Sequence, residues 1–96
     1  MLFQHSNCPA HYRHAQQLAR RAVQLGSKPA RWLYVAATDR LLRSQGRPQR
    51  YSTQYRCQGR VGQLEPYVRE TTDAERARYD VPPLTAALAR AKVICR

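Results

Sequence analysis

The segment from Trp32 to Ala37, with the sequence Trp-Leu-Tyr-Val-Ala-Ala, constrains the fold more than any other part of the chain. It lies inside a helical pattern that runs from about Ala30 to Ser44, and it is apolar nearly all round the helix. Such a helix is covered by other elements on more than one side. The segment therefore predicts the central helix of the domain.

Proline and glycine residues mark the ends of the first two helices. The first is predicted from Ala10 to Leu25, because Pro9 suits a first helical turn and Gly26 can adopt the positive φ of a helix C-terminus. The second follows Pro29 and ends before Gly46 for the same reasons. The predicted inward face of the first helix consists of Ala15, Leu18, Ala19, Ala22 and Leu25.

After Pro48 the pattern changes from a helical period to simple alternation, which is typical of a strand. Aromatic and β-branched side chains favour a strand near residues 50–57. Gly59 and Gly62 bracket a turn, and a second strand is predicted near residues 63–68. Pro66 restricts that second strand to a sheet edge.

Two further helices are predicted in the last third of the chain. Thr72 and Glu75 have the spacing of a capping box, so a short helix should run to about Tyr79. Pro82 and Pro83 precede a last helix that ends near Lys92. Its candidate inward residues are Leu84, Leu88, Ala91 and Val93. The predicted fold class is mainly α with a small β-hairpin, with about four helices in one small domain spanning residues 1–96.

Positive charge is concentrated in the first two thirds of the chain. The formal net charge is +11; residues 1–64 hold 11 basic residues and one acid, Asp39, whereas residues 65–96 hold 6 basic residues and 5 acids. A basic surface attracts polyanions, so nucleic acid is a candidate partner. A solvated, arginine-rich surface is the alternative, because no known nucleic-acid-binding motif accompanies the charge.

The sequence predicts no membrane association and a cytoplasmic location. It contains no apolar run of 18 residues, and its start lacks the basic and apolar regions of a signal peptide. Cys8, Cys57 and Cys95 form no Cys-x-x-Cys pair, and three cysteines cannot all pair with one another. We therefore expect ordinary thiols in a reducing compartment.

Candidate functional residues cluster between Asp39 and Gln54. Asp39 continues the apolar face of the second helix, so its carboxylate must be paired or hydrogen-bonded, either to a neighbouring arginine or to a polar group of the next segment. It could act as a general base or orient a ligand, but buried ion networks produce the same pattern, so a structural acid is the simpler interpretation from these residues alone. The candidate ligand-binding residues are Arg40, Gln49, Arg50, Tyr51, Thr53 and Gln54. Arginines can bind a phosphate or carboxylate, and the amides and hydroxyls can recognise polar groups.

Histidines and a cysteine near the N-terminus form the only metal-like spacing. His5, Cys8, His11 and His14 recur every three residues, but this matches no standard zinc pattern. Surface or capping residues are the simpler interpretation, so no metal is predicted. Motifs for a cofactor, a phosphate loop or a nucleophilic triad are also lacking, and we expect no cofactor.

Several segments together resemble a bacterial family known as domain of unknown function 6624. Its members typically show V-Q-H-A-D, then T-D-R, then G-x-x-Q-x-Y-G-T-Q, a hairpin and G-L-P-P-L. The matching segments here are Leu2-Phe3-Gln4-His5, Thr38-Asp39-Arg40, Gly46 to Gln54, and Asp80-Val81-Pro82-Pro83-Leu84. The resemblance covers nearly the whole chain in order. Ser52 stands where the motif has glycine, at a position suited to positive φ or a close backbone approach.

The resemblance implies a shared site made of the motif positions. These are His5, Asp39, Arg40, Gln49, Tyr51, Thr53 and Gln54. Fuller members carry additional helices before the Gln-His segment, so the resemblance implies a version that lacks them. It implies no activity, and whether the protein is an enzyme stays open.

The leading hypothesis is a small basic domain with a pocket for a small polar or anionic ligand. In that pocket, His5 and Asp39 are the candidate catalytic groups. One alternative is a basic nucleic-acid-binding module. Another is a truncated interaction domain that forms a homo-oligomer or binds a partner chain through apolar surface near Trp32.

Overall fold

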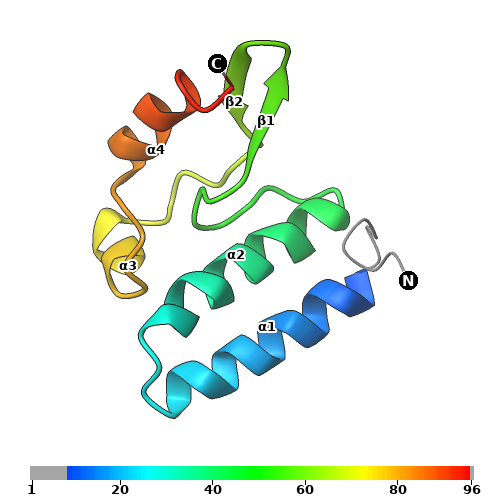
Figure 1. The fold of residues 1–96 in the computed structure, drawn as a ribbon, viewed down its shortest axis with the longest axis vertical. Coiled ribbons are helices and arrows are strands. Elements are labelled where there is room, and N and C mark those ends of the chain that lie inside the picture. The colour runs from blue at the N-terminus through cyan, green and yellow to red at the C-terminus, as the bar shows by residue number, and fades with distance from the viewer. Residues whose placement is uncertain (1–8, 96) are drawn as a thin grey trace.

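The fold is an α-helical hairpin joined to a smaller unit of one β-hairpin and two short helices (Figure 1). The computed structural model describes residues 9–95. Its elements are α1 (Pro9–Gln24), α2 (Pro29–Ser44), β1 (Tyr55–Gln58), β2 (Val61–Leu64), α3 (Asp73–Ala77) and α4 (Leu84–Ala91). The predicted class, mainly α with a small β-hairpin, is confirmed. None of the described helices has the length and apolar character needed to cross a membrane.

α1 and α2 lie side by side as an antiparallel pair (Figure 1). The turn between them forms because Gly26 adopts a φ of +93°, which a glycine reaches without strain. The backbone N–H of Ser27 then donates to the carbonyl of Ala22 at 3.0 Å and closes the end of α1. Farther along the pair, Gln16 Nε2 donates to Thr38 Oγ1 at 2.8 Å. The helix ends predicted from proline and glycine agree with the structure to within one residue.

The core lies on the face of α2 that is turned toward the second unit. Val35 on α2 is fully buried and packs with Tyr51 and Val81, which come from two separate loops. The Tyr79 ring is 5.5 Å, centroid to centroid, from both the Tyr51 and the Tyr34 ring. α2 is therefore the central helix, as its apolar segment predicts.

The predicted inward faces of three helices are partly wrong. Several large apolar side chains are at least 40% exposed: Leu18 and Leu25 in or just after α1, Trp32 and Leu33 on α2, and Leu88 and Val93 in or just after α4. The buried helical positions are mostly alanines, namely Ala30, Ala36, Ala37, Ala87 and Ala91. Small residues let backbones approach closely, so the larger side chains lie at the margins of the contacts. Periodicity alone does not distinguish these two sets.

The predicted strands are shorter and shifted in the structure. β1 begins at Tyr55 instead of residue 50, and β2 ends at Leu64 instead of residue 68. The two strands are antiparallel, with Tyr55 opposite Leu64. Residues 50–53 cannot extend β1 because three of their backbone N–H groups donate to the Asp39 carboxylate. A side chain thus takes the donors that a strand would need.

The turn of the β-hairpin contains Gly59, with a φ of +59°, as predicted. Gly62, in contrast, lies within β2 and not in the turn. A Cβ atom on Gly62 would overlap the carbonyl oxygen of Ala91 and lie 2.8 Å from Cys95 Sγ. Glycine at this position therefore permits the end of α4 to approach the hairpin.

A disulfide joins Cys57 in β1 to Cys95 near the C-terminus, with the two Cα atoms 5.6 Å apart. The prediction that all three cysteines are ordinary thiols is therefore wrong for these two. Sequence spacing could not reveal the pair, because the cysteines are 38 positions apart and only the packing of α4 on β2 brings them together. The bond also removes one argument for a reducing compartment, since disulfides persist mainly in oxidising surroundings.

α3 begins with the predicted capping box. The Thr72 hydroxyl accepts from the Glu75 backbone N–H at 3.1 Å, and the Glu75 side chain accepts from the Thr72 backbone N–H at 3.5 Å. Arg76 in this helix is 1% exposed, which its sequence context does not indicate. It donates to the Thr71 carbonyl at 2.8 Å and pairs with Asp73 at 3.0 Å. These bonds hold α3 against the loop that precedes it.

Candidate functional site

Asp39 is the centre of the polar cluster that the sequence indicates. Its carboxylate is 0% exposed and accepts four hydrogen bonds from residues 50–53. Oδ1 accepts from the backbone N–H groups of Arg50 and Tyr51 at 2.8 and 2.9 Å. Oδ2 accepts from the Thr53 backbone N–H at 3.0 Å and from its hydroxyl at 2.7 Å. The predicted pairing of Asp39 is confirmed, and its partner is the following polar segment.

Two opposing effects act on the pKa of Asp39. Burial raises this pKa above its ordinary value, while the hydrogen bonds from Thr53, Tyr51 and Arg50 lower it by favouring the charged form. Burial is the larger effect, so the hydrogen bonds offset only part of the desolvation cost. Because both oxygens of Asp39 accept hydrogen bonds and the residue has no exposed surface, Asp39 cannot contact a ligand directly. It fixes the conformation of residues 50–53, and a ligand can reach only the more exposed side chains of this segment and its neighbours.

Gln49 fixes the same loop from its other end. It is 0% exposed, and its Nε2 donates to the carbonyls of Gln54 and Glu65, both at 2.9 Å. Its Oε1 accepts from the Gln54 backbone N–H at 2.8 Å. All the hydrogen-bonding groups of this amide are directed at backbone, so Gln49 closes the loop and joins it to the end of β2.

Ser52 lies at the tip of this loop in a left-handed conformation. Its φ is +62°, which confirms that the position needs positive φ. A non-glycine residue in this region costs about 1–3 kcal/mol unless the surroundings hold it there. The side chain is 2% exposed, and its hydroxyl has no hydrogen-bond partner within residues 9–95. The strain and the unpaired hydroxyl make Ser52 the least satisfied residue of the loop.

A chain of hydrogen bonds runs from Asp39 to the protein surface. The Thr53 hydroxyl donates to Asp39 and accepts from Gln54 Nε2 at 3.0 Å. Gln54 Oε1 in turn accepts from Arg40 Nε at 3.3 Å. Two exposed or half-buried groups, the guanidinium and the amide, are thus held in a fixed relation by a buried carboxylate.

Arg40 and Gln54 line a surface depression of about 380 Å³, which we call the Arg40 depression. Its other lining residues are Tyr12, Arg43, Ser44, Tyr55 and Glu65. Arg43 Nε is buried and has no partner among the described residues, and Arg43 Nη2 lies 3.4 Å from Glu65. Two guanidiniums against one carboxylate leave the depression with a net positive charge.

The other predicted ligand-binding residues lie elsewhere. Arg50 forms an ion pair with Glu75 at 3.5 Å and lies over the Tyr51 ring, 5.4 Å from its centroid. Tyr51 itself is in the core, where burial raises its pKa. The predicted residues therefore divide into buried anchors (Asp39, Gln49 and Tyr51), a surface pair (Arg40 and Gln54), the half-buried Thr53 that links Asp39 to Gln54, and the separate Arg50.

The N-terminal candidates are only partly described. His5, the candidate catalytic histidine, lies outside the described residues. Cys8, which with His5 makes up half of the metal-like set, lies outside them too. His11 is half-buried and His14 is exposed on α1. Within residues 9–95, no group of three His, Cys, Asp or Glu side chains could hold a metal ion.

Sequence reasoning missed Arg43, Glu65 and the unpaired Ser52 hydroxyl. Arg43 follows Arg40 by three residues and therefore shares its helix face, a signal that could have identified it. Glu65 follows β2, and it lies at the depression because the β-hairpin folds β2 back along β1. No local sequence pattern predicts that position.

Known proteins give no further guide to this arrangement. Comparison of the chain with protein-family models, curated proteins and solved structures returned no match.

Proposed function

We propose that the protein binds a small anionic ligand, carrying a phosphate or carboxylate group, in the Arg40 depression. The observation that carries this proposal is the contact between Arg40 and Gln54, two motif residues from separate segments that meet beside Arg43. No carboxylate within residues 9–95 forms an ion pair with Arg40. A guanidinium held by an amide and left without a counter-ion suits an anionic oxygen.

The groups around the depression favour ligand binding over catalysis. Gln54 can donate or accept, and the Thr53–Asp39 bonds hold its side chain in place before a ligand arrives. Asp39 is too enclosed to exchange protons with a ligand in the depression. The function supported best is therefore binding, with Arg40 and Arg43 as anion anchors and Gln54 as the orienting group.

Two substitutions test this proposal, one that removes a positive charge from the depression and one that removes a negative charge. Arg40→Gln is expected to weaken the binding of inorganic phosphate or succinate about tenfold, because it removes the uncompensated charge. Glu65→Gln is expected to strengthen binding, because it removes the competing carboxylate. Isothermal titration calorimetry of each variant measures both effects.

Arg69→Gln is the matched control, because Arg69 is exposed and does not line the depression. It should bind as the unchanged protein does. Equal affinity of the unchanged protein and the Arg40→Gln variant, or no saturable heat with either anion, would contradict the proposal.

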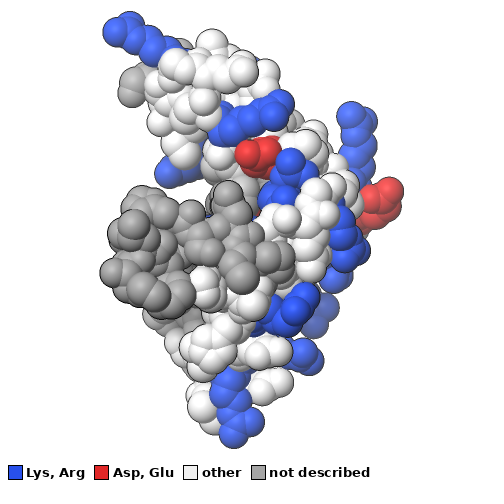
Figure 2. Space-filling model, turned by 90° about the vertical axis from the view of Figure 1, so that its right-hand side faces the viewer, with Lys and Arg blue, Asp and Glu red and all other residues white. Residues whose placement is uncertain are grey.

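A second candidate function, nucleic-acid binding, is favoured by the burial of Asp39. This residue is the only acid among residues 9–64, a part that the structure describes in full, and it is 0% exposed. The surface of that part therefore presents arginine and lysine without a single carboxylate. Figure 2 shows basic side chains distributed along one side of the molecule, with few acidic groups among them. Such a surface suits contacts to phosphates.

The salt dependence of DNA binding tests this candidate. If arginines on α1 contact the phosphate backbone of DNA, the logarithm of the association constant should fall linearly with the logarithm of salt concentration. The double variant Arg20→Gln/Arg21→Gln should reduce that slope by about 2 units, close to 0.9 for each lost phosphate contact. Fluorescence anisotropy with a labelled duplex gives the slope, and Arg78→Gln serves as the control. Absence of binding at low salt would eliminate this function.

The resemblance to domain of unknown function 6624 supports the first candidate, because Arg40, Thr53 and Gln54 are motif positions. The cytoplasmic location is likewise a proposal, and it conflicts with the Cys57–Cys95 bond unless that bond is shielded from cellular reductants.

A further inference from the structure

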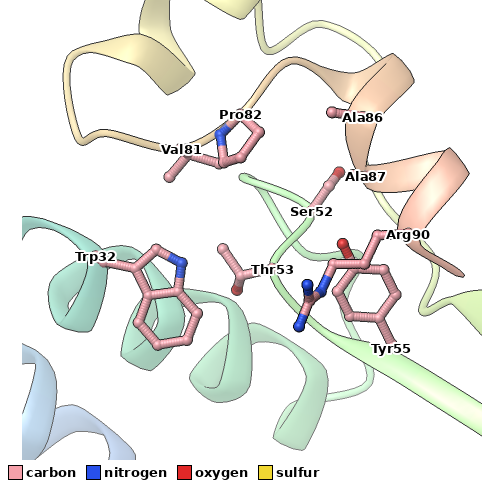
Figure 3. Close-up of a pocket in the computed structure, with 9 residues that line it drawn as sticks. All are labelled: Trp32, Ser52, Thr53, Tyr55, Val81, Pro82, Ala86, Ala87 and Arg90. Atoms are coloured by element: carbon pink, nitrogen blue, oxygen red, sulfur yellow. The ribbon is translucent and has the colours of Figure 1, made fainter. Parts of the chain in front are cut away.

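A separate cavity of about 440 Å³ lies where α2, the loop 50–54 and α4 meet (Figure 3). Trp32 enters it from α2 and Arg90 from α4, with Thr53 between them. One wall of the cavity is apolar and consists of Val81, Pro82, Ala86 and Ala87. The Tyr55 ring forms another wall. A concave site with apolar walls and a few convergent polar groups is typical of small-molecule binding.

The Ser52 hydroxyl is an unpaired polar group at this cavity. Ser52 lines the cavity, is 2% exposed and has no hydrogen-bond partner among the described residues. In Figure 3 its oxygen is directed toward the α4 side, near Ala86 and Ala87. Leaving a buried hydroxyl unpaired costs free energy, and rotation about the Ser52 Cα–Cβ bond would let it pair with a polar group of a ligand in the cavity.

Arg90 supplies the positive charge of the cavity. No carboxylate within residues 9–95 pairs with it, and none of the nine lining residues is acidic. Its charge reaches the adjacent aromatic wall: burial raises the pKa of Tyr55, and Arg90 acts in the opposite direction. An uncompensated guanidinium beside apolar walls favours an anion that carries an apolar body.

We propose that this cavity binds a small aromatic carboxylate bearing a hydroxyl substituent. The carboxylate lies on the Arg90 guanidinium, and the ring packs against Trp32 and the apolar wall. The ring hydroxyl pairs with Ser52. The site is independent of the Arg40 depression, because only Tyr55 lines both.

Trp32 provides a direct readout, because it is the only tryptophan of the chain. Its indole N–H gives a single resolved signal in a ¹H–¹⁵N correlation spectrum. Titration with 4-hydroxyphenylacetate is expected to shift this signal saturably. The neutral 4-hydroxyphenylacetamide should bind about tenfold more weakly, since it lacks the charge that pairs with Arg90.

Two variants assign the roles of the polar groups. Arg90→Gln should weaken 4-hydroxyphenylacetate binding about tenfold, whereas Arg78→Gln and Arg40→Gln should leave it unchanged. Ser52→Gly suits the positive φ and so preserves the loop, but it removes the hydroxyl. It should abolish the preference of the protein for 4-hydroxyphenylacetate over phenylacetate, which we expect to be about fivefold.

Four results would overturn the proposal. The first is a Trp32 signal that does not saturate at millimolar ligand. The second is an Arg90→Gln variant that binds as tightly as the unchanged protein. The third is an unaltered preference for the hydroxylated ring in Ser52→Gly. Loss of binding in Arg40→Gln would also overturn it, by showing that the probe occupies the Arg40 depression; failure of phosphate binding there leaves this cavity unaffected.

Discussion

Replacing Asp39 by asparagine is expected to lower the free energy of unfolding by about 3–5 kcal/mol. Asparagine retains one acceptor oxygen and places an NH₂ group where the other oxygen was. That group then faces either the Arg50 and Tyr51 N–H groups, which both lose their acceptor, or Thr53, whose backbone N–H loses its acceptor and whose hydroxyl must turn to accept instead of donate. In a domain of this size the melting temperature should fall by about 15 °C or more, measurable by circular dichroism.

Asp80→Asn is the matched control for this substitution. The Asp80 side chain is 57% exposed and forms an ion pair with Arg31 at 3.5 Å, and its φ of +60° suits asparagine. An exposed ion pair contributes little, so the variant should lose less than about 1 kcal/mol. Equal effects of the two substitutions would mean that the Asp39 carboxylate does not hold the loop.

The same carboxylate sets an expected dependence of stability on pH. Because burial raises the folded-state pKa of Asp39, the folded protein holds this proton at a higher pH than the unfolded chain does. Its contribution to stability is therefore complete below the unfolded value of about 3.9 and is lost as the pH rises through the raised value. The stability of Asp39→Asn should lack this fall; a rise over that window in the unchanged protein would contradict the direction of the pKa shift.

Removing the disulfide is the second substitution with a large expected effect. The double variant Cys57→Ser/Cys95→Ser should lose about 3–4 kcal/mol, because the bond joins residues 38 apart and restricts the unfolded chain. Serine at these positions should leave the packing of α4 on β2 intact, since Cys57 is exposed and Cys95 half-buried. Urea unfolding should show a lower midpoint for the variant, and reductant should lower only the midpoint of the unchanged protein.

A thiol count provides the control for the disulfide. In denaturant without reductant, the unchanged chain should react with one equivalent of a thiol reagent, at Cys8, and with three after reduction. Three reactive thiols before reduction would show that the bond does not form. That result would restore the expectation of free thiols in a reducing compartment.

The helices could be predicted because their signals are local. Pro9, Gly26, Pro29 and Gly46 act through their own backbone torsions, and the Thr72 capping box acts over three residues. Such effects do not depend on what the rest of the chain does. Predicted helix ends are correspondingly close to the observed ones.

The loop after α2 could not be predicted as a loop because its conformation depends on a distant side chain. Residues 50–57 have the alternation of a strand, and only the Asp39 carboxylate, more than ten residues earlier, redirects their N–H groups. The sequence did indicate that Asp39 needed partners from the next segment. It could not indicate that meeting this need would remove half of the predicted strand.

The division of the candidate residues has the same origin. Gln49 and Gln54 have the same side chain in similar local sequence, yet the Gln49 amide binds backbone groups while the Gln54 amide binds Arg40. Which amide is buried depends on the position of Glu65 and the end of β2. The cavity beside Ser52 depends equally on α4, whose approach requires Gly62.

The Cys57–Cys95 bond gives the chain the connectivity of a lasso, with a closed ring from residue 57 to residue 95 and a long tail that begins the sequence. Tyr55 and Arg90 are close in sequence to the two closing residues, so these walls of the cavity between α2 and α4 stay near each other even when the chain is unfolded. Folding then has to bring Trp32, from the tail, and Val81 and Pro82, from within the ring, up to these two walls. Much of the entropic cost of assembling that cavity is removed when the ring closes, before α2 packs against it.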